Sequence, residues 1–228
     1  DMDVNERLEY LDREYLSDFD VSDVDIHANI ERQAAFDKPV YETKPYAITE
    51  DESLEDNTYL SYNAVIGTSV DAKLYLAFQI LDYALVMTPG APVKQALLDA
   101  GISTDVYSSY ETSLYQPVYS IVAKNSNSKE QDRFVSVIND TLEKLVKDGI
   151  NERTIEAGIN YYEFKYREAD YGPYPKGLMY YLTMMDSWLY DETKPFIHIE
   201  AGDTFDELKK NARNGYFEKL IKEYLLDN

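Results

Sequence analysis

The chain has 228 residues, of which 44% are hydrophobic and 14% aromatic, enough to bury the core of one large domain. Its 43 acidic residues outnumber its 22 basic ones and give a formal net charge of -21, which repels phosphate backbones and anionic lipid headgroups. The lack of cysteine excludes disulfides, a thiolate nucleophile and cysteine-ligated metal sites.

We therefore expect neither nucleic acid nor membrane as a partner. The acidic surface has two interpretations, a solubility-promoting coat or long-range attraction of cationic peptides. No apolar run approaches the roughly 20 residues of a membrane span, and the acidic start at residues 1–3 is unlike the basic start of a signal peptide. We expect a soluble protein that is an excised segment of a longer chain.

The first predicted element is an amphipathic helix over residues 4–16, in which apolar residues recur at helical spacing. They are Leu8, Leu11, Tyr15 and Leu16. Helical spacing then fails, and regularly spaced aspartates over 17–38 are typical of a connecting segment. The predicted organisation is an N-terminal helix and linker from a preceding domain over 1–38, followed by one domain over 39–228.

Two strands are predicted next, over 40–48 and 58–66, because both segments are rich in tyrosine, threonine, valine and isoleucine. The second also alternates apolar residues on one face, at Leu60, Tyr62, Ala64 and Ile66. The acidic segment 50–57 lacks the glycine and ligand order of a calcium loop, so we interpret it as a charged loop.

Residues 71–87 are apolar nearly all round a helix, which predicts an element buried against the sheet. Two prolines and a glycine over 89–92 break it, and a short helix over 93–100 ends at Gly101 in a left-handed cap. Segments 104–113 and 114–124 then predict an antiparallel hairpin that joins the first two strands in one sheet.

Helices dominate the rest of the chain. A capping box of Ser128 and Gln131 begins a helix that ends at Gly149, and Asn151 caps another that ends at Gly172-Pro173. Three more are predicted over 176–190, 204–213 and 215–226. The predicted fold class is therefore α+β, a mainly antiparallel sheet covered by helices in two layers.

Residues for catalysis are scarce. A catalytic zinc site needs three protein ligands, and the two histidines, His27 and His198, have only Glu31 and Glu200 as neighbours with ligand spacing. We interpret both histidines as structural or surface residues. Ser69 lacks the flanking glycines of a nucleophile elbow, and no glycine-rich phosphate loop is present. No catalytic or metal-binding residue is predicted.

Tyrosine stands out, with 22 residues against 8 phenylalanines. Its large apolar ring and hydroxyl suit a wall that contacts a peptide or another domain, although a compositional bias of strands would also explain the number. The predicted substrate-binding residues are Tyr59, Tyr62, Tyr107, Tyr110 and Tyr119.

Three motifs together resemble the second domain of pitrilysin/insulinase-type zinc metallopeptidases, in particular the presequence-protease subfamily. The first is Glu6-Arg7-Leu8-Glu9-Tyr10-Leu11-Asp12-Arg13-Glu14-Tyr15-Leu16, which is similar to the helix that closes the first domain of those enzymes. The second is the helix joint from Pro92-Val93-Lys94-Gln95-Ala96 to Gly101, and the third is Gly177-Leu178-Met179 with Trp188 after it. The resemblance covers the chain from end to end.

The resemblance implies an α+β domain of a clam-like enzyme that degrades unfolded peptides. It also implies that zinc lies in the preceding domain, in an inverted H-x-x-E-H motif that this chain lacks. The partners would be other domains of the parent and an unfolded peptide, added to a strand edge in 59–67 or 107–119. The isolated chain is expected to be inactive, with a bacterial cytoplasmic or a mitochondrial-type location.

Two alternatives remain open. One is a stand-alone interaction module that binds a partner protein through a tyrosine-rich sheet edge. The other is a carboxylate-based hydrolase, which would require a cleft with a strongly perturbed acid pair.

Overall fold

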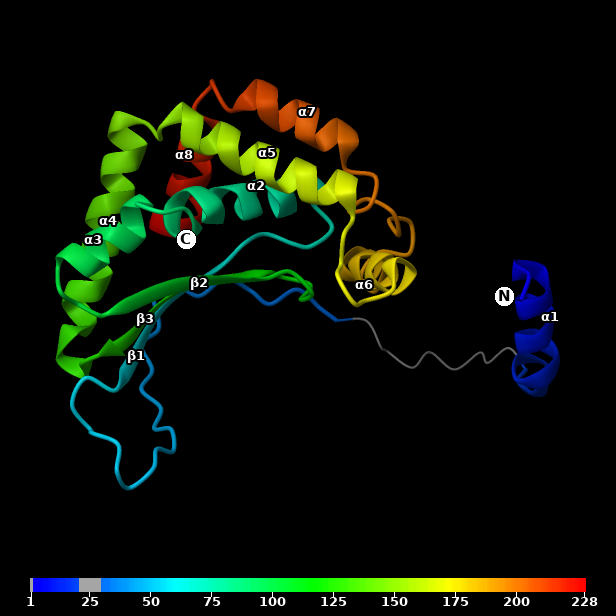
Figure 1. Ribbon diagram of the computed structural model, residues 1–228, viewed down its shortest axis with the longest axis horizontal. Helices are drawn as coiled ribbons and strands as arrows, with labels where there is room; N and C mark the ends of the chain where they lie inside the picture. The colour runs from blue at the N-terminus through cyan, green and yellow to red at the C-terminus, as the bar shows by residue number, and fades with distance from the viewer. Residues whose placement is uncertain (1, 21–29) are drawn as a thin grey trace. The chain divides into compact units, whose positions relative to one another are not determined.

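The structure is a computed structural model that describes residues 2–20 and 30–228 (Figure 1). The chain forms two compact units, Asp1–Ile30 and Glu31–Asn228. The boundary lies within the predicted linker, and His27 lies outside the described residues.

The first unit contains one α-helix, α1 (Val4–Glu14), followed by the 3-10 turn η1 (Leu16–Asp18). The Asp3 carboxylate caps α1 by accepting a 2.9 Å hydrogen bond from the Asn5 amide. The predicted apolar stripe is present, but no described residue of this helix is buried. In the described unit the stripe is therefore exposed to solvent.

The second unit begins with an irregular segment over 31–57, and the strand predicted for 40–48 is wrong. Pro45 supplies no amide donor to a ladder, and all residues of that stretch except Ile48 are exposed. The segment is held by side chains instead. Gln33 and Gln116 exchange amide hydrogen bonds of 2.6 and 3.2 Å, and Tyr46 packs against Tyr59.

The sheet has three antiparallel strands, β1 (Thr58–Val65), β2 (Asp105–Glu111) and β3 (Val118–Ser126), in the order β1-β3-β2. Ile121 of β3 lies between Tyr62 of β1 and Ser108 of β2. The predicted hairpin of β2 and β3 and its pairing with β1 are confirmed. Since β3 lies in the centre, β1 and β2 are the edges of the described sheet.

Helices cover one face of this sheet (Figure 1), which confirms the predicted two-layer α+β class. The first group is α2 (Ala72–Asp82), the π-helical turn η2 (Tyr83–Met87) and α3 (Pro92–Asp99). The second is the 3-10 turn η3 (Ser128–Glu130), α4 (Gln131–Asp148), α5 (Glu152–Glu168) and α6 (Lys176–Trp188). The last is α7 (Gly202–Asn211), α8 (Tyr216–Ile221) and the π-helical turn η4 (Lys222–Leu226).

Two predicted helix ends are confirmed. Gly101 has φ +65°, and the amides of Gly101 and Ile102 bond back to Leu98 and Leu97, a Schellman cap on α3. The Asn151 side chain accepts from the Arg153 amide at 3.0 Å and so caps α5.

Two other predicted ends are wrong. Ser128 does not cap α4, because Asn127 instead caps the 3-10 turn that precedes that helix. Helix α5 ends at Glu168 rather than at Gly172-Pro173, because Ala169 adopts a left-handed conformation with φ 46°. The glycine-proline pair therefore lies in the loop that leads to α6.

The core lies between the sheet and α2. Phe78 of α2 is fully buried and packs edge-on against Tyr119 of β3. On the opposite side of α2, Gly158 lets α5 approach closely, since a Cβ there would lie 3.2 Å from the Ile80 side chain. Within residues 2–20 and 30–228, the helical stretch 72–99 is long and apolar enough to cross a membrane by composition, yet 61% of its most apolar window is buried inside the protein.

Candidate functional site

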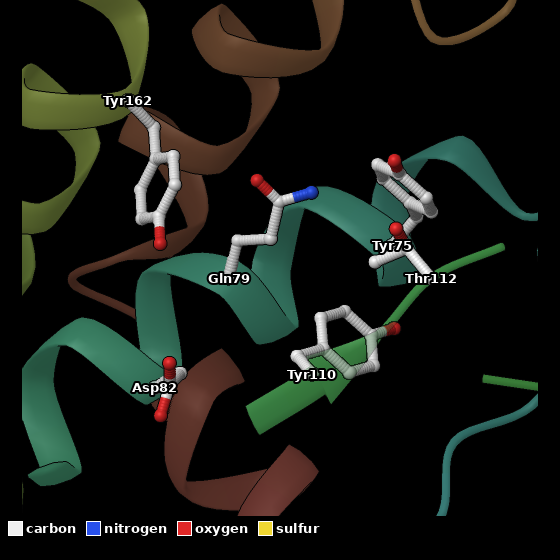
Figure 2. Close-up of a pocket in the computed structure, with 6 residues that line it drawn as sticks. All are labelled: Tyr75, Gln79, Asp82, Tyr110, Thr112 and Tyr162. Atoms are coloured by element: carbon white, nitrogen blue, oxygen red, sulfur yellow. The ribbon is translucent and has the colours of Figure 1, made fainter. Parts of the chain in front are cut away.

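A cavity of about 350 Å³ lies beside edge strand β2, on the helix-covered face of the sheet (Figure 2). Three elements supply its lining. Helix α2 contributes Tyr75, Gln79 and Asp82; β2 and the turn after it contribute Tyr110 and Thr112; and α5 contributes Tyr162.

Helical spacing explains the contribution of α2. Residues 75, 79 and 82 are spaced i, i+4 and i+7 and therefore share one face of the helix. In β2, alternation places Tyr110 on the same side as Val106, which is fully buried. Figure 2 shows Tyr162 reaching from α5 towards α2.

Asp82 is the carboxylate of the lining and is only 6% exposed. It accepts a 3.0 Å hydrogen bond from the buried hydroxyl of Tyr119. Burial raises the pKa of the Asp82 carboxyl and the pKa of the Tyr119 hydroxyl, because each charged form would lose contact with water. The hydrogen bond fixes the orientation of this carboxyl at the cavity wall.

A second carboxylate, Asp186, lies immediately behind the lining, near the end of α6. It accepts hydrogen bonds from the hydroxyls of Tyr75 at 2.8 Å and Thr112 at 3.2 Å. Burial also raises the pKa of Asp186. Two lining residues therefore connect the cavity to α6.

The hydroxyl of Tyr110 is buried and has no hydrogen-bond partner among the described residues. An unpaired buried hydroxyl costs about 1–3 kcal/mol unless water or a ligand satisfies it. The hydroxyl of Tyr162 lies 3.8 Å from the sulfur of Met87, a weak acceptor. The Tyr162 hydroxyl can therefore pair with a ligand that enters the cavity, whereas the Tyr110 hydroxyl is enclosed and contributes its ring to the lining.

His198 lies next to the cavity but is occupied structurally. Its Nε2 donates to the Ser69 carbonyl oxygen at 2.7 Å, and its ring stacks on Tyr75 at 3.8 Å between centroids. Burial lowers the pKa of His198 to about 4, so the ring is neutral at physiological pH. Glu200, which has ligand spacing to His198 in the sequence, is exposed.

Metal binding finds no support in the described ranges 2–20 and 30–228. No three His, Asp or Glu side chains there gather as metal ligands. In the acidic loop 50–57, Glu52 turns back and accepts from the Thr49 amide at 2.7 Å. The described residues therefore do not fit a zinc ion, and no chemistry is assigned to one in this chain.

The five tyrosines predicted to bind peptide are divided between the two faces of the sheet. Tyr59 and Tyr107 are each 43% exposed on the open face. Tyr110 lies in the cavity, Tyr119 is 1% exposed beneath it, and Tyr62 donates its hydroxyl to the Leu225 carbonyl. Tyr119 is therefore enclosed by the protein and not available for direct contact with a peptide.

Sequence patterns missed the other lining residues. The lining residues Tyr75, Asp82 and Tyr162 lie on α2 and α5, and Asp186 lies behind them on α6, so their approach depends on tertiary packing. One signal was available: Asp82 is the single acidic residue within the apolar helix of residues 72–87. A carboxylate on a buried helix needs a polar partner and so indicates a polar cluster.

Comparison with known proteins identifies related chains. The model of a family described as "Peptidase M16 inactive domain" matches residues 1–162. Protein HypA of Clostridium perfringens is 40% identical over 226 residues, which are 99% of this chain and 23% of that protein. Presequence protease 1, chloroplastic/mitochondrial, of Arabidopsis thaliana is 30% identical over 221 residues, covering 94% of this chain and 20% of that protein. The chain spans between a fifth and a quarter of these relatives.

Solved structures show the same fold. A proposed zinc protease from Bordetella pertussis Tohama I superposes with a TM-score of 0.57 at 15% identity, covering 74% of this chain and 87% of that one. The inactive peptidase domain of a proposed zinc protease from Bordetella parapertussis gives a TM-score of 0.54 at 13% identity, over 74% and 86% of the two chains.

Proposed function

The chain belongs to the M16 peptidase family as an inactive domain, and from this premise we propose that it forms part of the substrate chamber of a zinc-dependent metalloendopeptidase that degrades unfolded peptides. Zinc and the catalytic residues would lie in the preceding domain of the parent. This chain would bind the peptide without cleaving it. We propose a bacterial cytoplasmic location, with a mitochondrial-type compartment as the alternative, because the relatives include a bacterial protein and a chloroplastic/mitochondrial protease.

The free edge of β2 carries the proposal. Among the described residues, β2 pairs only with β3, so the backbone groups on its other side are available to an extended peptide. The other edge strand, β1, is less open, because Tyr46 packs on Tyr59 and bonds to Asn57 beside it. We therefore place the peptide along β2.

Two experiments test edge binding in the 228-residue chain. A photo-crosslinking residue at Ser109 of β2 should capture a bound unfolded peptide, whereas the same residue at Ser61 of β1 should not; both serines are exposed. Two versions of the peptide should be compared, one N-methylated at the odd-numbered amides and the other at the even-numbered amides. Their affinities should differ at least about tenfold, because only every second amide of an added strand pairs with β2. Equal affinities of the two versions would contradict strand addition.

Contact with other domains is supported by α6. The exposed apolar residues of α6 and its C-cap follow the spacing of one helix face: Leu178, Tyr181, Leu182, Trp188 and the C-cap Leu189. Exposed apolar faces of this kind mark interaction sites. We assign this face to the remainder of the parent, because the curated relatives are at least four times as long as the chain.

The alternative, a stand-alone interaction module, would bind a partner protein through the tyrosine-rich sheet edge. The flanking sequence distinguishes the two proposals. An H-x-x-E-H motif upstream of this segment supports a peptidase parent. A long upstream sequence without that motif favours the module.

A further inference from the structure

The cavity lies where side chains of a peptide paired with β2 would point. Val106, Ser108 and Tyr110 of β2 face the helices. Neighbouring strands place directly opposed residues on the same side of a sheet. Every second side chain of an added strand would therefore meet the flank of α2 that carries Gln79 and Asp82.

The lining has the chemistry of a cation site. None of its six residues is basic, and three of them present phenol rings. Asp82 supplies a carboxyl group at the wall, and Asp186 adds a second carboxyl group behind Tyr75. A volume of about 350 Å³ is near the lower limit of ligand pockets, and thus suits one side chain rather than a larger molecule.

We propose that this cavity receives the guanidinium or ammonium group of an arginine or lysine side chain from a peptide bound along β2. The proposal rests on the peptide-binding function above and specifies its substrate class. Phenol faces attract cations, and a carboxylate forms charge-assisted hydrogen bonds with them. The net charge of -21 would draw such peptides towards the domain.

Other side chains fit this cavity less well. An acidic side chain would approach Asp82 and Asp186 with no basic residue in the lining to offset the repulsion. A large apolar side chain would remove the Asp82 carboxyl group further from water without offering it a hydrogen-bond donor, which is costly for a buried polar group.

A pair of capped peptides tests the proposal. Both have a strand-forming sequence of threonine and valine, with either arginine or its neutral isostere citrulline at one central position. We expect the 228-residue chain to bind the arginine peptide at least about tenfold more tightly at low salt, measured by titration calorimetry. Equal affinities overturn the cation site and leave peptide binding intact. If neither peptide binds, the proposed function fails as well.

Variants locate the effect. Asp82→Asn should reduce the preference for arginine over citrulline to about twofold or less, whereas Asp203→Asn removes the same charge from the exposed start of α7 and should leave the preference unchanged. Gln79→Lys, on the partly exposed flank of α2, places a competing ammonium group in the cavity. It should lower the affinity for the arginine peptide at least about tenfold. Retained preference in a folded Asp82→Asn or Gln79→Lys protein contradicts the assignment.

Discussion

Helices α2 and α6 have similarly apolar sequences but different surroundings. Seven residues of α2 are buried, because the sheet lies below this helix and α5 lies above it. In α6 the only buried residue is Ser187, although leucines, tyrosines and a tryptophan follow one face. The difference shows that apolar composition predicts that a helix has a partner, while the tertiary structure decides whether that partner belongs to the same chain.

Polar side chains connect these two regions. Tyr75 of α2 bonds to Asp186 and stacks on His198, and Tyr190 stacks on Tyr115 beside the β2–β3 turn. Helix α6 is therefore attached to the domain through its last residues and the segment that follows it. Four predictions test this contrast between a core helix and a tethered one.

The largest effect is expected in α2. Phe78→Ala should lower the free energy of unfolding by about 3–5 kcal/mol, because it leaves a cavity beneath the helix. The matched change in α6, Tyr181→Ala, removes a side chain that is 50% exposed and should cost about 0.5 kcal/mol or less. Urea unfolding measures both, and equal losses would contradict the contrast.

The second effect is a pH dependence of stability at His198, which follows α6 in the chain and stacks on Tyr75 of α2. His198 has a folded-state pKa of about 4, below the roughly 6.5 of the unfolded chain, so the unfolded state binds the proton more tightly. The stabilising contribution of neutral His198 is fully present above about pH 6.5 and falls as the pH drops towards 4. Between pH 7 and pH 4.5, the free energy of unfolding of the wild type should therefore fall by about 2.5 kcal/mol more than that of His198→Phe.

Unfolding curves of the two proteins between pH 7 and 4.5 measure this difference. Parallel pH profiles would mean that His198 becomes charged without disturbing the fold, contrary to its burial.

The third effect concerns the hydrogen bond beneath the cavity. Tyr119→Phe keeps the ring but removes the donor to Asp82, and should cost about 1–2 kcal/mol because a buried acceptor loses its partner. Tyr107→Phe is the matched control on the open face and should cost under about 0.5 kcal/mol. Thermal unfolding compares them, and an equal cost would contradict a structural role for the bond.

The smallest effect in the isolated chain is expected on the exposed face of α6. The double change Leu182→Ser and Leu189→Ser should alter its unfolding free energy by about 0.5 kcal/mol or less. In the parent-length protein the same pair should instead lower the midpoint of thermal unfolding, if other domains cover this face. An unchanged midpoint there would contradict the proposed contact.

Local patterns were sufficient to predict most of the elements. Alternation at Leu60, Tyr62 and Ala64 predicted β1, and apolar residues all round 71–87 predicted the core helix. The strand predicted over 40–48 was wrong because strand-forming residues require a paired backbone as well, which Pro45 impedes.

The cavity illustrates what local patterns omit. Its lining joins Tyr75 to Tyr162, which are far apart in sequence, so only the packing of α5 across α2 brings them together. Tyr119 could have been placed correctly, since it alternates with the buried residues Ile121 and Ala123 and therefore faces the helices.

The one-ended attachment of α6 also has a consequence for its dynamics. From Gly172 to Asp186 no residue is buried, whereas Ser187 is fully buried and donates its hydroxyl to the Lys194 carbonyl at 2.6 Å. Backbone amides exchange with solvent deuterium through local opening, which needs less free energy where fewer contacts must break. Deuterium uptake should therefore be fast at Leu178 and slow towards Trp188, a gradient along one helix that docking to a partner would abolish.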